Sequence, residues 1–302
     1  MNRCHTTNRR GITLMEVLIS LGILSVGLAS VVALIPAGGS QAKLSVIEDR
    51  RAALGYAALS DAIGRGILNP ARWSTIPAAP YSIAIDPLGQ NLAGVPRFPA
   101  SITLVDLAGI AAGSADAEAV FRSADDLVYD TSQSEDDPAI PMYFAGSNRR
   151  LSDGNFSWLA TLLPETAGAS AQYFRLSVVC FYKRAIPPDV SATAFSSTPT
   201  VPASSTSFSC DCNLTDDEYR SLFPRGTAVL LSAGVQPPVW RQVVLASPTR
   251  TAGSITAVEV MFDRPLPGSW GPTWATNLHA FQGAIGVTEK LVTLEGSSPW
   301  SQ

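Results

Sequence analysis

Residues 12–35 read ITLMEVLISLGILSVGLASVVALI, and this apolar stretch decides how the chain is organised. As an α-helix it would be about 36 Å long, which exceeds the roughly 30 Å thickness of the hydrocarbon core of a bilayer. We therefore predict one membrane-spanning helix. Three basic residues, Arg3, Arg9 and Arg10, precede the stretch. Because positive charge stays on the cytoplasmic side of a membrane, the part of the protein that follows is predicted to be translocated.

Glu16 is the only charged residue inside this stretch. A carboxylate in an apolar span costs about 2.5–3.5 kcal/mol on insertion scales, and such a residue is by default functional. If the protein were cut between Gly11 and Ile12, the new α-amino group would lie one helical turn from Glu16, or it would meet the Glu16 of a neighbouring copy. Pairing would offset the cost of both charges, so the sequence predicts that the Ile12 amine of the same or a neighbouring copy is the partner of Glu16.

Residues 9–19, RRGITLMEVLI, resemble the processing motif of type IV pilins and type II secretion pseudopilins. The resemblance implies that residues 1–11 are a prepilin leader, that a prepilin peptidase cuts after Gly11, and that it methylates Ile12. It also implies that Glu16 assists assembly by pairing with the terminal amine of a neighbour. The family usually has Phe at the position of Ile12. The resemblance covers about the first 45 residues and is strongest to minor pilins and pseudopilins.

The resemblance implies a function, a location and partners. The expected function is that of a minor pilin or pseudopilin subunit, assembled into a type IV pilus-like or type II secretion filament. The expected location is a bacterial inner membrane, crossed once, with the N-terminus cytoplasmic and the head periplasmic, and later the filament or cell surface. The expected partners are prepilin peptidase, other pilin or pseudopilin subunits and the membrane.

Two other interpretations of the N-terminus remain open from the residues alone. One is a secretory signal peptide, because Pro36 is followed by a Ser40-Gln41-Ala42 site with small residues. The other is a plain signal anchor with no further role. Neither interpretation explains Glu16.

The rest of the protein is predicted to form an antiparallel β-rich head, which makes the fold class α+β. Pro36 and the Gly38-Gly39 pair predict a kink or stop after the span, with helix resuming and ending at Asn69-Pro70. The strongest strand candidates are Tyr173–Tyr182 and Ile255–Phe262. The predicted segments are 1–11 leader, 12–39 transmembrane helix, 40–70 helix extension, 71–186 first part of the head, 187–209 Pro/Ser/Thr-rich loop, and 210–302 second part of the head.

Weaker strand candidates recur between turn residues along the rest of the head. They are Tyr81–Ile85, Ser101–Leu107, Ala228–Leu231, Gln242–Ala246 and Gly286–Leu294. One short helix is also expected, with Thr215 as its N-cap and Glu218 three residues later.

The composition argues against several classes of chemistry. Charged residues make up 15% of the protein, the formal net charge is −4, and no basic stripe is present, so no nucleic-acid binding is predicted. Only His5 and His279 are available as histidines, so we predict neither an enzyme nor a catalytic residue. We predict no cofactor and no metal site, because the acidic runs lack EF-hand spacing.

Three cysteines lie in the body, namely Cys180, Cys210 and Cys212. An oxidising compartment would allow one disulfide, from Cys180 to Cys210 or Cys212. The alternative is that all three remain thiols.

Three functional hypotheses follow, from different classes of protein. The first is the structural filament subunit described above. The second is a membrane-tethered binding module whose β-rich extracytoplasmic head recognises a ligand. The third is a tethered hydrolase, against which the near absence of histidine counts.

Overall fold

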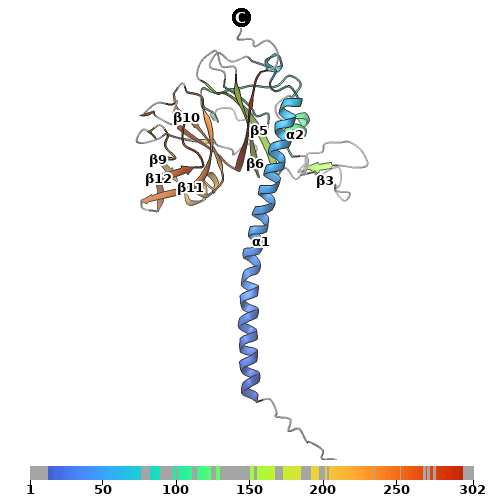
Figure 1. The fold of residues 1–302 in the computed structure, drawn as a ribbon, viewed down its shortest axis with the longest axis vertical. Helices are drawn as coiled ribbons and strands as arrows, with labels where there is room; N and C mark the ends of the chain where they lie inside the picture. The colour runs from blue at the N-terminus through green and yellow to red at the C-terminus, as the bar shows by residue number, and fades with distance from the viewer. Residues whose placement is uncertain are drawn as a thin grey trace, which may run out of the picture. The chain divides into compact units, whose positions relative to one another are not determined.

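The computed structural model describes most of the protein from Thr13 onward (Figure 1). The described residues are 13–75, 82–88, 98–99, 101–110, 114–123, 127–129, 150–152, 155–166, 173–184, 192–196, 201–202, 204–234, 236–251, 253–267, 270, 273–274 and 277–294. By its internal contacts the protein divides into two units, residues 1–50 and residues 51–302.

A long N-terminal helix followed by antiparallel β-rich sheets confirms the predicted α+β class. The helix α1 runs from Leu14 to Gly64 and contains Pro36. The kink or stop predicted at Pro36 is therefore not a break in the helix. An interior proline removes one backbone hydrogen bond and commonly kinks or breaks a helix, but α1 continues through Pro36 as one element. The helix ends five residues before the predicted Asn69-Pro70, where the backbone enters a turn and the short 3₁₀ helix η1, Pro70–Arg72.

The strands of the described residues form two larger sheets and two strand pairs. The first sheet has the order β15-β6-β5-β1-β2, and the second has the order β7-β14-β10-β11-β12-β9. Of these, β1 and β2 pair in parallel, and every other pair is antiparallel. The first sheet comprises β15 (Ala284–Val292), β6 (Phe174–Tyr182), β5 (Phe156–Pro164), β1 (Ile83–Ile85) and β2 (Thr103–Leu104).

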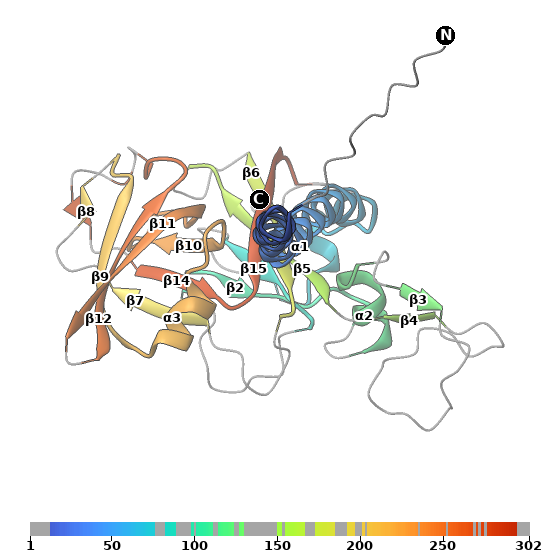
Figure 2. The same cartoon turned by 90° about the horizontal axis from the view of Figure 1, so that it is seen from below.

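The second sheet has one more strand than the first. It curls so that its two end strands, β7 and β9, contact one another (Figure 2). Its strands are β7 (Ala192–Ser196), β14 (Asn277–Phe281), β10 (Ala228–Ser232), β11 (Val239–Thr251), β12 (Ser254–Phe262) and β9 (Ser207–Leu214). The strand pairs are β8 (Val201–Pro202) with β13 (Thr273–Trp274), and β3 (Leu127–Tyr129) with β4 (Arg150–Ser152). Two short helices complete the elements, α2 (Ala115–Phe121) and α3 (Asp216–Leu222).

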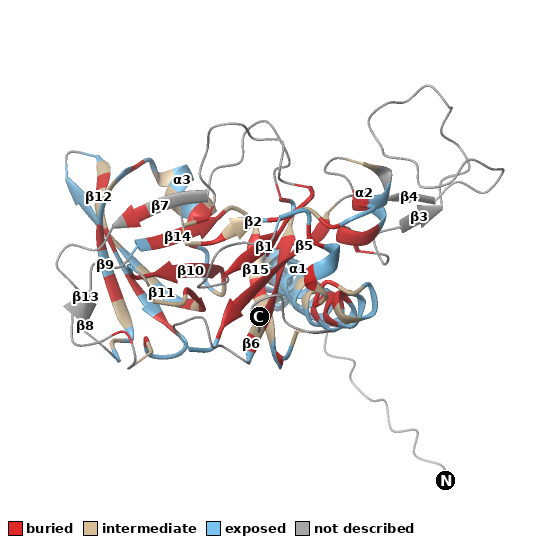
Figure 3. Ribbon diagram, turned by 90° about the horizontal axis from the view of Figure 1, so that it is seen from above, coloured by how far each residue is buried: buried red, intermediate tan, exposed pale blue. Residues whose placement is uncertain are grey.

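The two sheets pack against each other through a shared apolar core (Figure 3). Alternate residues of a strand point to opposite faces of its sheet. On β10, Ala228 and Leu230 therefore join the core between the sheets, whereas Val229 and Leu231 join a second core inside the curled sheet. Both faces of β10 are buried, which explains its continuous apolar sequence.

The last turns of α1, from Arg51 to Gly64, pack on the first sheet. Leu54, Ala58 and Ala62 of this segment are buried. Cys180 of β6 faces the helix, since its Sγ lies 3.8 Å from the Arg51 carbonyl oxygen. Its neighbours Val179 and Phe181 face the second sheet. The first sheet is thus a middle layer between the end of α1 and the curled sheet.

A buried ion pair lies where β1 and β6 end. Arg184 donates from Nη1 to Oδ1 of Asp86 over 2.8 Å and from Nη2 to Oδ2, and its guanidinium lies 4.3 Å from the ring centroid of Phe181. Such a bidentate, hydrogen-bonded geometry is what allows two charges to remain away from water.

Candidate functional site

The first turn of α1 holds Glu16, the carboxylate that the sequence predicts to lie inside the membrane span. The N–H of Glu16 donates to the carbonyl oxygen of Thr13 over 3.0 Å and to its hydroxyl oxygen over 3.3 Å. The N–H of Val17 also donates to the Thr13 carbonyl, over 3.2 Å. Thr13 therefore acts as the N-cap, and Glu16 stands three residues into the helix.

This arrangement gives Glu16 a second role, in capping its own helix, which was not predicted from the sequence. Thr13-Leu14-Met15-Glu16 fits the capping-box pattern, in which a Glu or Gln at the third helical position supports the N-cap. A negative charge in the first turn also interacts favourably with the helix dipole. The signal was present in the sequence as Thr and Glu at the required spacing. Both effects reduce the cost of placing a carboxylate at this end of the helix.

Beyond Glu16 the helix presents a continuous apolar surface. The large apolar side chains between Leu14 and Ile35 are all exposed, from 46% at Val17 to 81% at Leu14. Exposed apolar surface costs roughly 25 cal/mol per Å² in water, so a surface of this extent requires lipid or other apolar helices around it. By length and composition, α1 can cross a membrane. We call the segment Leu14–Ile35 the apolar shaft.

The serines of the apolar shaft do not present unsatisfied hydroxyls. Ser20 donates to the carbonyl oxygen of Glu16 over 2.8 Å, Ser25 to that of Gly22 over 2.8 Å, and Ser30 to that of Val26 over 2.6 Å. In hydrocarbon no water is present to accept such a donor. These intrahelical bonds make the serines compatible with a lipid environment.

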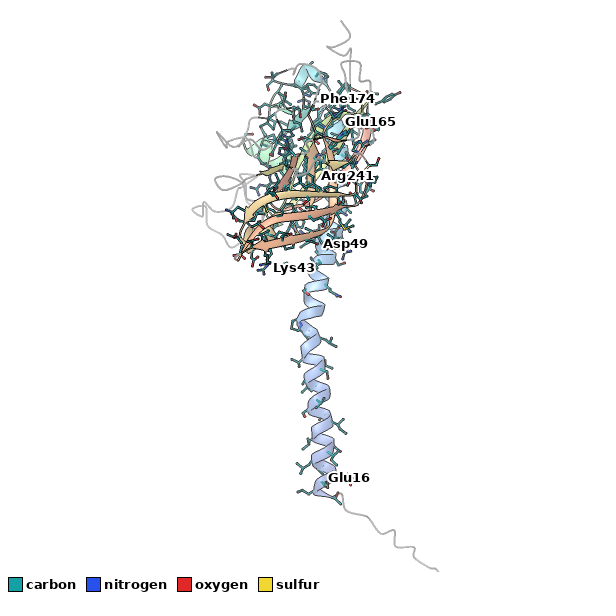
Figure 4. The ribbon with its side chains drawn as sticks, turned by 90° about the vertical axis from the view of Figure 1, so that its left-hand side faces the viewer. Glu16, Lys43, Asp49, Glu165, Phe174 and Arg241 are labelled. Atoms are coloured by element: carbon teal, nitrogen blue, oxygen red, sulfur yellow. The ribbon has the colours of Figure 1, made fainter. Side chains whose placement is uncertain are left out.

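The charge pattern along the helix marks where its apolar part begins and ends (Figure 4). Glu16 lies at the start of α1, and Lys43 and Asp49 lie further along the same helix. Lys43, Glu48 and Asp49 are exposed. Charged side chains of this kind belong in water or at the interface rather than in hydrocarbon.

The predicted cleavage point, between Gly11 and Ile12, lies outside the described residues. The same holds for the whole predicted leader, residues 1–11.

In the head, one histidine and one serine come together. The Oγ of Ser232 on β10 lies 3.3 Å from Nε2 of His279 on β14, and both residues are buried. Burial lowers the pKa of His279 to about 4. The other ring nitrogen, Nδ1, has no hydrogen-bond partner among the described residues. The pair thus lacks the third group that would orient the imidazole of a catalytic triad.

The three cysteines of the head are free thiols on two different sheets. Cys180 lies on β6, whereas Cys210 and Cys212 lie on β9, so the disulfide considered from the sequence is not formed. Burial raises the pKa of Cys180 and of Cys210 to about 12, and it also raises the pKa of Cys212. Thiols held protonated in this way are poor nucleophiles. Within the described ranges, no group of three or more His, Cys, Asp or Glu residues is arranged to hold a metal ion.

One comparison with known proteins found a match, and this match lies in the N-terminal segment. Residues 6–32 match the family model of the prokaryotic N-terminal methylation motif. The protein carries this prepilin-type motif, which confirms the resemblance to type IV pilins and pseudopilins for that segment. Neither the comparison with curated proteins nor that with solved structures found a match. The matched region contains Gly11, Ile12 and Glu16 and most of the apolar shaft.

Proposed function

We propose that this protein is a minor pilin or pseudopilin subunit, cut by a prepilin peptidase and assembled through α1 into a type IV pilus-like or type II secretion filament. One observation carries the proposal. The methylation motif at residues 6–32 coincides with a helix whose first turn holds Glu16 and whose apolar side chains remain exposed. An exposed apolar helix with one acid at its start is the element that such an assembly requires.

The two parts of α1 have separate tasks in this proposed function. The apolar shaft holds the precursor in the inner membrane, with the head on the periplasmic side. After cleavage the amine of Ile12 carries a positive charge, which pairs with Glu16 of a neighbouring subunit. The residues from Arg51 onward anchor the head, because Leu54, Ala58 and Ala62 are buried there. The protein acts as a structural subunit and not as an enzyme.

Mass spectrometry of the purified protein tests the processing step. We expect a mature protein that begins at Ile12 and carries one N-terminal methyl group. An intact Met1, or a product that begins near Lys43, would contradict the proposal. Substitution of Gly11 by a larger residue should leave the precursor uncut in the membrane fraction.

Two variants of Glu16 separate its charge from its role in capping. Glu16→Gln removes the charge but keeps a residue that a capping box accepts, whereas Glu16→Ala removes both. We expect both variants to be cleaved normally and to be lost from sheared filament fractions that contain other pilin-like subunits. Ser20→Ala, one turn along the same helix, is the matched control and should be incorporated normally. Normal incorporation of Glu16→Gln would refute the charge-pairing role.

A further inference from the structure

A pocket lies at the seam where the two sheets of the head meet. Its volume is about 230 Å³, and we call it the seam pocket. It is lined by the end of β5, the start of β6, the start of β11 and the segment after β12, including Pro164, Glu165, Arg175, Pro237, Arg241 and Trp270. Figure 4 labels Glu165 and Arg241 on the head. Neither the methylation motif nor the proposed assembly involves this pocket.

Arg241 is the unusual residue in the seam pocket. It is only 5% exposed. Its Nε and Nη2 donate to the carbonyl oxygen of Pro265 over 3.2 and 2.9 Å, and its Nη1 donates to that of Trp240 over 2.7 Å. A guanidinium has five N–H donors, so one N–H remains on each terminal nitrogen. Within the described part of the protein these two donors have no acceptor.

Glu165 of the pocket lining, and Glu289 and Asp263, whose charges act on Arg241, are already engaged by other groups. Glu165 accepts three charge-assisted bonds from Arg175, from Nη2 to Oε1 over 2.6 Å, from Nη2 to Oε2 over 2.7 Å and from Nε to Oε2 over 3.1 Å. Glu289 accepts from Ser177 and Arg264, each over 3.2 Å. Asp263 accepts from the N–H of Gln242 over 2.9 Å and from Nε of Arg264 over 3.1 Å.

Arg241 is therefore a buried cation without an ion-pair partner among the described residues. Burial lowers its pKa, but an arginine stays charged in proteins. The charges of Asp263 and Glu289 act on Arg241 and partly compensate it, but neither carboxylate bonds to it. A buried charge with two unfilled donors remains costly, because the water that hydrated it has been removed. An anion that entered the seam pocket would satisfy both the charge and the two donors.

We propose that the seam pocket binds a single carboxylate group of a peptide, held by Arg241. The two remaining N–H groups come from different terminal nitrogens, which suits the two oxygens of a carboxylate. The pocket is smaller than the 300–1,000 Å³ typical of sites for drug-sized ligands, so it accommodates about one residue. Proline and tryptophan walls suit the apolar part of that residue.

The charge of the pocket favours a carboxylate over a phosphate. Glu165 and Arg175 neutralise each other, which leaves Arg241 as the single net positive charge of the lining. One positive charge matches a monovalent anion, whereas phosphate groups are usually held by several cations or by a helix N-terminus. An acidic residue and the C-terminus of a peptide present the same carboxylate chemistry, and the experiment distinguishes these two sources.

Saturation-transfer NMR with the full-length protein in detergent micelles tests the proposal. The probes are N-acetyl-Ala-Glu-amide for an acidic residue and N-acetyl-Ala-Ala with a free carboxylate for a peptide C-terminus. Their neutral counterparts are N-acetyl-Ala-Gln-amide and N-acetyl-Ala-Ala-amide, and inorganic phosphate is the competing anion. We expect one or both carboxylate probes to bind, and the one that binds more tightly identifies the source. Equal binding of the neutral probes, tighter binding of phosphate, or no binding up to about 10 mM would overturn the proposal.

Matched variants locate the binding. Arg241→Gln should weaken binding by about 10- to 100-fold, as expected for loss of hydrogen bonds to a charged group. Arg220→Gln removes an exposed arginine on α3 and should leave binding unchanged. Unchanged binding by Arg241→Gln would refute the site.

A second pair of variants leaves Arg241 in place, in case Arg241→Gln does not fold. Pro237→Glu adds a carboxylate to a half-buried position of the pocket wall and should abolish binding of the probes, whereas Pro237→Gln adds a neutral group of equal size. Retained binding by Pro237→Gln with loss in Pro237→Glu supports the proposal. Equal binding by both would contradict it.

Discussion

Gly55 lies where α1 closely approaches β15 and β6 of the first sheet. A Cβ atom at this position would lie 2.2 Å from Oγ1 and 3.1 Å from Cβ of Thr288 on β15, and 3.7 Å from Sγ of Cys180. A glycine inside a helix costs about 1 kcal/mol relative to alanine. That cost is offset here by the close packing that the missing side chain permits.

Gly55→Ala should therefore destabilise the head, although alanine is the better helix former. Overpacking of this kind costs about 1–3 kcal/mol, which outweighs the gain in helix propensity. Chemical denaturation of the full-length protein in detergent measures the change. Gly64→Ala is the control, because a Cβ there meets nothing within 4 Å. A second change, Thr288→Ala, should restore stability to Gly55→Ala if the contact is responsible, and an equal effect of Gly55→Ala and Gly64→Ala would refute it.

His279 should make the stability of the head depend on pH. Burial lowers its pKa from the ordinary 6.5 to about 4, so between these values the unfolded protein binds more protons than the folded protein. Above pH 6.5, His279 is neutral in both the folded and the unfolded protein and costs no stability. As the pH falls from 6.5 to 4, the free energy of unfolding decreases by about 3 kcal/mol in total, because the unfolded protein gains the proton first. Denaturation at pH 7.5 and pH 5, compared with His279→Gln, checks this. An equal loss of stability in the variant would show that other groups are responsible.

At the scale of single elements, α3 contains the capping box predicted from the sequence, and a substitution there measures how much it stabilises the protein. Thr215 accepts the N–H of Glu218 over 3.3 Å, and the Glu218 carboxylate accepts the N–H of Thr215 over 2.8 Å. Both halves of the predicted capping box are thus present. Arg250 also forms an ion pair with Asp216, at 2.7 Å.

Thr215→Ala should lower the free energy of unfolding by about 1 kcal/mol, the usual cost of losing an N-cap side chain. The measurement is again chemical denaturation. Ser221→Ala in the same helix is the control, because its hydroxyl bonds, among the described residues, only to the carbonyl oxygen of Glu218. A change at Ser221 as large as that at Thr215 would argue against a capping effect.

The sequence predicted those strands whose residues alternate or are rich in aromatic and β-branched side chains. The candidate Tyr173–Tyr182 corresponds to β6, and Ile255–Phe262 corresponds to β12. In contrast, β5 was not singled out, because its nine residues are buried on both faces and so show no alternation. Periodicity alone does not distinguish such a run from a buried helix.

The segment 187–209 was predicted to be a loop, yet it contains β7 and β8 and the start of β9. The partners of β7 and β8 are β14 and β13, which lie far along the sequence. Pro, Ser and Thr in such strands carry little intrinsic signal, and pairing with distant strands determines their structure. The seam pocket could not be predicted for the same reason, since residues of both sheets line it.

At the scale of the whole molecule, the two sheets of the head share one core. Trp240 on β11 is fully buried between them, and its Nε1 donates to Oγ1 of Thr161 on β5 over 2.9 Å. Thr227, just before β10, donates to the carbonyl oxygen of Ala284 on β15 over 2.6 Å. These contacts tie the stability of each sheet to that of the other.

We therefore expect the head to unfold in one transition, with the same midpoint by circular dichroism and by tryptophan fluorescence. Trp240→Ala should lower the stability by about 3–5 kcal/mol, as for other large-to-small changes in a core. Val244→Ala, at an exposed position of the same strand, should have little effect. Two separate transitions in the unmodified protein would show that the sheets fold independently.

The self-contained hydroxyls of the apolar shaft have a consequence for how a subunit changes its surroundings. In the assembly proposed above, Ser20, Ser25 and Ser30 donate inside the helix, so transfer of α1 from lipid into a bundle of neighbouring helices exchanges no serine hydrogen bond. The apolar shaft contacts apolar groups before and after this transfer, so its surface contributes little to the barrier. Glu16 differs, because the proposed pairing of its charge with a neighbouring subunit exists only in the filament. Direction and timing of the transfer would then depend on a single carboxylate.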